Sequence, residues 1–213
     1  MSVSKMVFVG AVAALTFAGC AKAKEEIGRT NEQAQSKGTW YAKCDTTNVA
    51  WQIAGINSSQ KVFDFYTEGA ESIRYFSDAA CAHQVGVGTY KGTADIGGPA
   101  AAPGSRTLDL NLTNVFMTIT DQGVVDTLNG TNPVPDCGIN DWAVNVEREV
   151  SGVAGQALNC PYVQAPHGVY DIVKTDGQTL FFGADDAVLN KSTPQARPTT
   201  LATEGLTHNA SGM

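Results

Sequence analysis

The chain contains 213 residues, of which 43% are hydrophobic and 16% are charged, so it suits one compact domain or two very small ones and excludes disorder throughout. Lysine and arginine total 14 against 21 acidic residues, a net charge of -7, which excludes the positive field that nucleic-acid binding requires. The 22 glycines and 8 prolines favour turns over long helices and predict a β-rich fold.

The N-terminus has the features of a signal peptide covering residues 1–19. Met1–Lys5 gives a positive start, Met6–Phe17 is an apolar run, and Ala18-Gly19 supplies the small residues before a cleavage site. The apolar run is too short to span a bilayer as a helix, so it is a targeting segment and not an anchor.

Residues Leu15–Cys20 resemble the bacterial lipobox, in which the cysteine becomes the acylated N-terminus, although Phe17 replaces the usual Leu, Val or Ile. The resemblance implies acyl chains such as palmitate on Cys20, which together would hold the protein permanently in a membrane. Ala21, where retained lipoproteins carry Asp, implies the outer membrane of a bacterial cell envelope. Ordinary secretion with removal of Cys20 is the alternative.

We expect a lipidated polar tether over residues 20–36, because Ile27 is its only large apolar residue after Cys20. The folded domain is expected over residues 37–202. Alternation of apolar and polar residues indicates its strands. The predicted strands are Gly38–Cys44, Lys61–Tyr66, Ser72–Ser77, Val85–Thr89, Thr107–Thr113, Trp142–Glu147, Val169–Lys174 and Thr179–Gly183.

Other signals complete the chain. Asp176-Gly177 between the last two predicted strands is typical of a hairpin turn. Asp121–Asn129 is predicted as one short helix, capped by Thr120 and ended by Gly130 in a left-handed conformation. Ile96–Ser105 is expected to be an irregular connection. Residues 203–213 are expected to be a flexible tail.

About eight or nine short strands must hide their edges, and closure into a barrel does so at least cost. We therefore predict an all-β domain with one short helix, an antiparallel β-barrel or strongly curled sheet of about 8–9 strands. Two flat sheets remain possible.

Four cysteines remain after Cys20, an even number in a chain that reads as exported, which predicts two disulfides. Nearest-neighbour pairing joins Cys44 to Cys81 and Cys137 to Cys160, and strand counting supports the first pair. Zinc is disfavoured because no C-x-x-C pair exists and the three histidines are scattered, so we expect no metal.

Several segments together resemble the extracellular domain of the adenomatosis polyposis coli down-regulated family, over roughly residues 37–202. They are Gly38-Thr39-Trp40 before Cys44, Tyr75–Cys81, Cys137-Gly138 before Trp142, Cys160, Gly168–Ile172 and Arg197-Pro198. The resemblance implies a curled antiparallel β-structure with an apolar cavity suited to acyl chains. Animal members antagonise Wnt signalling, but a bacterial lipoprotein has no Wnt protein to bind, so this activity is not expected here.

The opening Gly38-Thr39-Trp40 is also similar to the G-x-W of lipocalins, so the barrel is expected to be lipocalin-like. That likeness gives Trp40 a structural role at the closed end of the barrel, where Arg197 could cover it.

A further set of apolar residues is predicted to face inward and to bind a ligand. This candidate ligand-binding set is Phe63, Phe65, Tyr75, Val87, Leu110, Leu112, Val144, Val146, Tyr170 and Phe182. The same residues would equally form a filled core, and a flat partner-binding face is a third possibility.

The sequence lacks the serine-hydrolase, Walker, dinucleotide-binding and zinc-protease motifs, so we expect no enzyme and no cofactor. The leading hypothesis is an envelope-anchored lipoprotein whose barrel binds a hydrophobic or acylated ligand. The alternative is a protein-binding scaffold or inhibitor module in the envelope, using loops such as Asp45–Gln60 and Ser151–His167.

Overall fold

A computed structural model describes residues 38–47, 49, 55–64, 70–130, 137, 139–152, 165–184 and 191–208. The predicted signal peptide and tether, including Cys20, lie outside the described residues. Phe65 and Cys160 of the predicted domain also lie outside them. The described strands are β1 (Thr39–Tyr41), β2 (Ser58–Asp64), β3 (Ala70–Phe76), β4 (Gln84–Pro99), β5 (Arg106–Ile119), β6 (Glu147–Glu149), β7 (His167–Thr175), β8 (Thr179–Phe182) and β9 (Leu206–Thr207).

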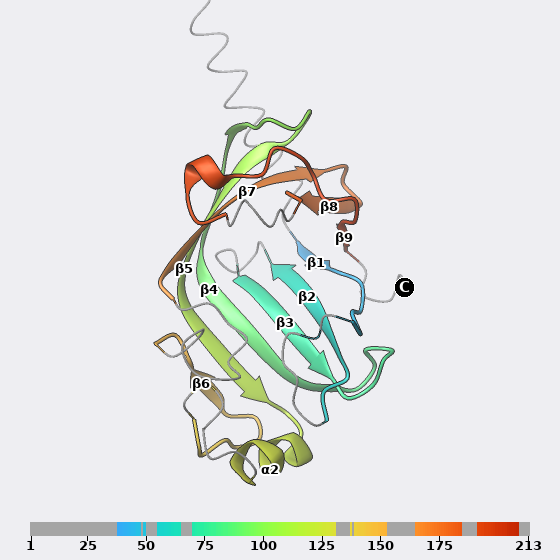
Figure 1. Ribbon diagram of the computed structural model, residues 1–213. Helices are drawn as coiled ribbons and strands as arrows, with labels where there is room; N and C mark the ends of the chain where they lie inside the picture. The colour runs from blue at the N-terminus through green and yellow to red at the C-terminus, as the bar shows by residue number, and fades with distance from the viewer. Residues whose placement is uncertain are drawn as a thin grey trace, which may run out of the picture.

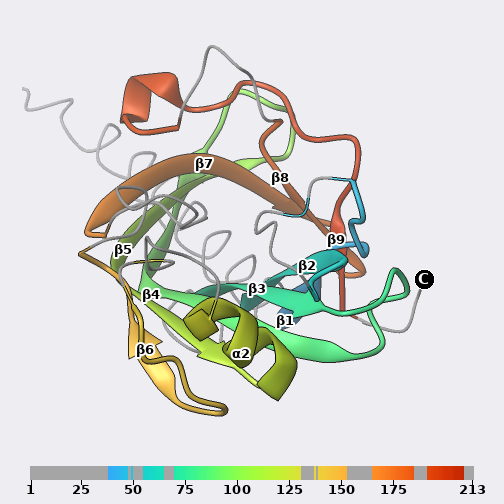
Figure 2. The same cartoon turned by 60° about the horizontal axis from the view of Figure 1, so that its bottom comes forward.

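Eight of these strands close into an antiparallel barrel, which confirms the predicted fold class. The strand order is β4-β3-β2-β1-β9-β8-β7-β5, and β5 pairs back onto β4. The short strand β6 adds to β5 beyond the part of β5 that pairs with β7. Figures 1 and 2 show the strands surrounding one interior. Closure removes the free sheet edges that an open sheet of these strands would expose.

The longest described strands of the barrel are β4 and β5. Leu108, Leu110 and Leu112 all point to one buried face, as their alternation predicts. The register shifts between Lys91 and Gly92. A Cβ on Gly92 would lie 2.1 Å from the carbonyl oxygen of Asn111, so this bulge requires glycine.

The connection expected over residues 96–105 is shorter than predicted. Strand β4 continues to Pro99 and β5 begins at Arg106, so the hairpin loop covers only residues 100–105. Ala100 donates its N–H to the carbonyl of Ser105, which closes the loop. Glycine and proline at the end of β4 therefore did not stop the pairing; a second register shift between Ile96 and Pro99 accommodates them.

Helix α2 (Gln122–Gly130) lies across one end of the barrel (Figure 2). It buries Val124, Val125 and Leu128, the face that its periodicity predicts. Asp121, and not Thr120, is the N-cap, because its Oδ1 accepts the N–H of Val124 at 3.0 Å. Gly130 is the last helical residue, not a left-handed ending.

The predicted β7–β8 hairpin is confirmed. Asp176 Oδ1 accepts the N–H groups of Gln178 and Thr179, at 2.9 and 2.7 Å. Gly177 has a φ of 88°, a conformation that favours glycine.

The predicted strand Trp142–Glu147 is wrong. Residues up to Val146 form a turn around Asn145, whose φ is 59°, and only Glu147–Glu149 pairs, as β6. The side chain of Asn129 takes the place of a neighbouring strand: it donates to the carbonyl of Trp142 and accepts the N–H of Trp142. The N–H and carbonyl of Trp142, which alternation predicts to pair with a neighbouring strand, are therefore bonded to a side chain of the helix.

The chain beyond residue 202 also differs from the expected tail. Leu206–Thr207 forms β9, which pairs with β1 on one side and with β8 on the other. Leu206 is buried in the core. These two residues supply the last strand between β1 and β8, so the C-terminal segment completes the barrel.

Candidate ligand site in the barrel

The register of the strands decides which candidate residues face the barrel interior. Trp40 of β1 lies opposite Phe63 of β2, and both are almost fully buried. Tyr75, Leu110 and Leu112 also join the same core. Phe182 packs against that core, and its ring centroid lies 5.1 Å from that of Phe63.

Six described members of the predicted ligand-binding set do not line the pockets described below. Tyr75 and Leu112 belong to the filled core, and Val87, Val144, Val146 and Tyr170 lie elsewhere. In β4, the register shifts beside Tyr75, so that Val85 joins the core and Gly86 faces Tyr75, which turns Val87 to the outer face. Val146 is exposed at 39%, and Val144 only touches the core from its turn.

Tyr170 also lies on the outer face. It sits opposite Asp109 in the β5–β7 pairing, while its neighbour Val169 lies opposite Leu110 and packs against the core. The guanidinium of Arg197 lies 5.6 Å from the centroid of the Tyr170 ring. Both alternating faces of this segment carry apolar residues, so alternation alone does not show which face points inward.

A small pocket of about 170 Å³ lies among residues of six strands, β2, β3, β5, β7, β8 and β9, and of the chain after β8. Its apolar wall consists of Phe63, Leu110, Phe182 and Leu206. Five charged side chains also line it, Lys61, Glu71, Asp171, Lys191 and Glu204, together with Gly183 and Ala202. A cavity of about 150 Å³ can accept a benzene molecule, so this pocket has room for one group of that size.

Asp171 organises one side of this pocket from β7. Its Oδ1 accepts the N–H of Gly183 at 3.0 Å, and its Oδ2 accepts the ammonium of Lys191 at 2.9 Å. Lys191 also donates to the carbonyl of Gly183 at 3.1 Å. The pair is largely buried, so breaking it would leave an uncompensated charge against the pocket.

Lys61 of β2 marks the opposite side. Its ammonium lies 3.0 Å from Glu71 Oε1 of β3, and their side chains are 55% and 18% exposed. Both residues share the inward face with Phe63, because Phe63 lies opposite Glu71 and Lys61 lies two positions earlier. The exposure of an inward-facing lysine indicates that the interior opens to solvent here.

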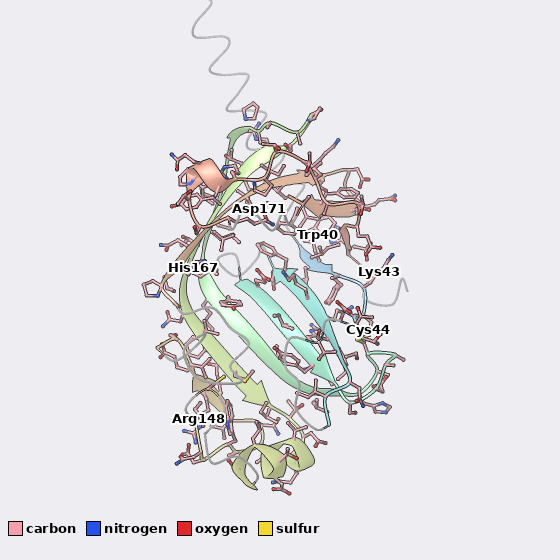
Figure 3. All side chains as sticks on the ribbon, viewed as in Figure 1. Trp40, Lys43, Cys44, Arg148, His167 and Asp171 are labelled. Carbon is pink, nitrogen blue, oxygen red and sulfur yellow. A yellow bond between two sulfur atoms is a disulfide. The ribbon has the colours of Figure 1, made fainter. Side chains whose placement is uncertain are left out.

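A larger pocket of about 670 Å³ adjoins the small one. Lys61 and Glu204 line both pockets, so the two are contiguous. The remaining lining includes Ile73, Ser59 and the segment after β1: Ala42, Lys43, Cys44, Asp45 and Thr47. Figure 3 shows Lys43 and Cys44 where the chain leaves β1, with Trp40 and Asp171 toward the interior. Its volume lies in the range of about 300 to 1,000 Å³ that is usual for ligand pockets.

The predicted disulfide between Cys44 and Cys81 is confirmed and forms part of this region. It joins the chain after β1 to the loop after β3, with an S–S distance of 2.09 Å. Cys137 is also disulfide-bonded, but its expected partner Cys160 lies outside the described residues.

The loop that carries Cys81 is held by Asp78. Its carboxylate accepts the N–H groups of Ala80, Ala82 and His83. The bond from the His83 N–H is the largest cause of the lowered pKa of Asp78, and the bonds from Ala82 and Ala80 lower it further, while burial acts in the opposite direction. Two other carboxyls have lowered pKa values: hydrogen bonds from Asn114 and Ser151 lower that of Glu149, and backbone N–H groups lower that of Asp176.

The side chain of Trp40 is fully buried, and the residue that covers it is not Arg197. The ring of His208 lies against it, with 3.6 Å between centroids. A Cβ on Gly38, whose φ is 145°, would lie 2.5 Å from that histidine ring, so glycine is required in the G-x-W opening. Arg197 instead binds the outer side of β5 and β7, donating to Leu108 O, Asp171 O and Asp109 Oδ1.

The charged pocket residues were missed by the sequence analysis, which sought apolar linings. A signal existed for two of them. Lys61 alternates in phase with Phe63, and Asp171 alternates in phase with Val169 and Val173. A charge within an inward apolar series is expensive to bury and therefore marks a paired or functional position.

Within the described residues, no cluster of three or more histidine, cysteine or acidic side chains is arranged to hold a metal ion. Their helices include none with the length and apolar character needed to cross a bilayer. Models of known protein families give no match to this chain, and a search of curated protein sequences gives no significant match.

Proposed function

We propose that this protein is an envelope lipoprotein whose barrel binds a small amphipathic ligand, with a hydrophobic or acyl portion in the interior. The observation that carries the proposal is the small pocket, where an apolar wall and two ion pairs face the same space. Ligand sites combine mainly apolar surface with a few fixed polar groups in this way.

The size of the pocket narrows the ligand. Most of the interior is filled by Trp40, Tyr75 and the leucines of β5, so the space among Phe63, Phe182 and Leu110 admits a ring or a short stretch of chain. The larger pocket beyond Lys61 then takes the rest of the ligand. The acyl-binding expectation attached to the resemblance to the adenomatosis polyposis coli down-regulated family agrees with this division.

Native mass spectrometry of the chain lacking residues 1–20, purified from its own envelope, tests the binding. We expect a co-purifying small molecule whose occupancy falls in the variant Leu110→Phe, because the added ring volume enters the small pocket. Val87→Phe is the matched control: it adds a similar ring on the outer face and should retain the ligand. Circular dichroism establishes that each variant is folded.

Two results would contradict the proposal. One is that native mass spectrometry finds only the ligand-free protein, both as purified and after incubation with an envelope lipid extract. The other is equal occupancy in Leu110→Phe and Val87→Phe. If protein partners persist in a pull-down with folded Leu110→Phe while no small molecule is found, the scaffold alternative replaces ligand binding.

The membrane anchor is a separate part of the proposal and depends on acylation of Cys20. Replacing Cys20 by Ser should move the protein from the membrane fraction to the soluble fraction, because each buried methylene contributes about 0.8 kcal/mol to attachment. Metabolic labelling with a radioactive fatty acid should label the wild type alone. Membrane attachment that persists in Cys20→Ser would contradict lipid anchoring.

A further inference from the structure

The larger pocket carries charges of both signs in equal number. Lys43 and Lys61 supply two positive charges, and Asp45 and Glu204 supply two negative ones. Lys43 Nζ lies 3.3 Å from Glu204 Oε1, and Lys61 Nζ lies 3.0 Å from Oε1 of Glu71. Each lysine of this wall therefore already has a carboxylate neighbour.

We infer that the polar head of the ligand is zwitterionic, carrying one positive and one negative group. The inference rests on the proposed function, because it names the ligand class of the same site. An anionic head that contacted Lys61 would face the carboxylates of Glu71 and Glu204 in the same space, and a cationic head would face the lysines. A head with both charges pairs with both kinds of side chain.

The existing ion pairs do not prevent this exchange. The side chains of Lys43 and Glu204 are 67% and 72% exposed, and pairs this exposed contribute little to stability. A zwitterionic head replaces each existing contact by an equivalent one and leaves no charge without a partner. A head of a single sign would take one partner of an ion pair and leave the other without a contact, so the pocket favours a head that carries both charges.

The position of Lys61 and Glu204 couples the head to the apolar end. Both residues line the small pocket as well as the large one. A head held between them has its attached chain directed toward Phe63 and Phe182, whose rings form the apolar wall. The ligand class is therefore a zwitterionic amphiphile with one short or narrow apolar end.

Four probes with the same decyl chain test the head: decyl phosphocholine, decyl phosphate, decyl trimethylammonium and decyl maltoside. Their affinities for the chain lacking residues 1–20 are measured by isothermal titration calorimetry below each critical micelle concentration. We expect the phosphocholine to bind at least about fivefold more tightly than the other three.

Two charge-neutralising variants give opposite shifts. Glu204→Gln removes a negative charge, so decyl phosphate should gain relative to phosphocholine, by about fivefold; Lys61→Gln should favour the trimethylammonium probe by a similar factor. Glu147→Gln and Lys91→Gln are the matched controls, because that exposed ion pair lies outside both pockets. Both controls should leave the order of the four affinities unchanged.

The outcomes separate this inference from the proposed function. Equal binding of all four probes, or tightest binding of a probe with a single charge or none, overturns the zwitterionic head and leaves the apolar site standing. Unshifted preferences in Glu204→Gln and Lys61→Gln also overturn it. Failure of every probe to bind overturns the inference, and the native-mass result then decides whether the barrel binds any small molecule.

Discussion

At the scale of single residues, carboxylates fix much of the local structure. Asp78, Asp121, Asp171 and Asp176 each accept backbone N–H groups in loops or at the ends of the helix and strands. Asp171 differs from the others because it is buried beside the small pocket and paired with Lys191. One residue type thus serves both in surface turns and in the candidate site.

The lowered pKa of Asp78 predicts a pH-dependent contribution to stability. The folded pKa lies below the unfolded value near 3.8, so the contribution is present above that value and is lost as pH falls through the folded pKa. Asp78→Asn should therefore destabilise the protein more at pH 7 than at about pH 3, because part of the contribution is already lost below the unfolded value. Urea unfolding at both pH values measures the difference.

Asp95→Asn is the control for this measurement, because Asp95 is an exposed residue of β4. It should leave the unfolding midpoint unchanged at either pH. A pH dependence in Asp78→Asn equal to that of the wild type would show that the loop bonds do not depend on the charge of Asp78.

At the scale of elements, side-chain capping and strand pairing compete for the same backbone. Trp142 has the alternating neighbours of a strand, yet Asn129 satisfies its N–H and carbonyl, and the segment forms a turn. In contrast, Leu206 and Thr207 form a strand of only two residues because β1 and β8 lie on both sides of it. Local pattern cannot distinguish these cases, because the deciding partner is distant in the chain.

The N-cap of α2 supports a quantitative prediction. Asp121→Ala removes the acceptor of the Val124 N–H and should lower the free energy of unfolding by about 1 kcal/mol. Asp126→Ala, in the middle of the same helix, removes only a surface contact with Gln122 and should cost about 0.2 to 0.5 kcal/mol. Denaturant unfolding of both variants provides the comparison, and equal losses would argue against Asp121 as the cap.

At the scale of the whole molecule, closure of the barrel brings distant segments together at the site. Lys61 comes from β2, Asp171 from β7, and Lys191 and Glu204 from the C-terminal segments. The Cys44–Cys81 disulfide ties Cys44, which lines the larger pocket, to the loop after β3. The pockets therefore depend on the complete barrel and not on one hairpin.

Removal of that disulfide tests its part in global stability. The two cysteines are 37 residues apart, and loop-closure entropy over that span contributes about 4 kcal/mol. The double variant Cys44→Ser/Cys81→Ser should lose a free energy of unfolding of this order, measured with denaturant. A reducing agent should lower the stability of the wild type through this bond but not that of the variant, which lacks it. A loss below about 1 kcal/mol would show that the unfolded chain is not appreciably constrained by it.

The sequence alone predicted an antiparallel β-domain, the leucine face of β5, the helix, the β7–β8 turn and the nearest-neighbour pair Cys44–Cys81, because alternation, turn chemistry and cysteine spacing can be read along the chain. It left a closed barrel, a curled sheet and two flat sheets possible, and the pairing of β5 with β4 decided for the closed barrel. Tertiary structure decided the rest. The register shift beside Tyr75 turned Val87 outward, His208 took the place expected for Arg197 over Trp40, and β9 formed only between its two neighbours. It also decided the charged lining, because Lys61, Asp171 and Glu204 share a pocket only after the first and last strands meet.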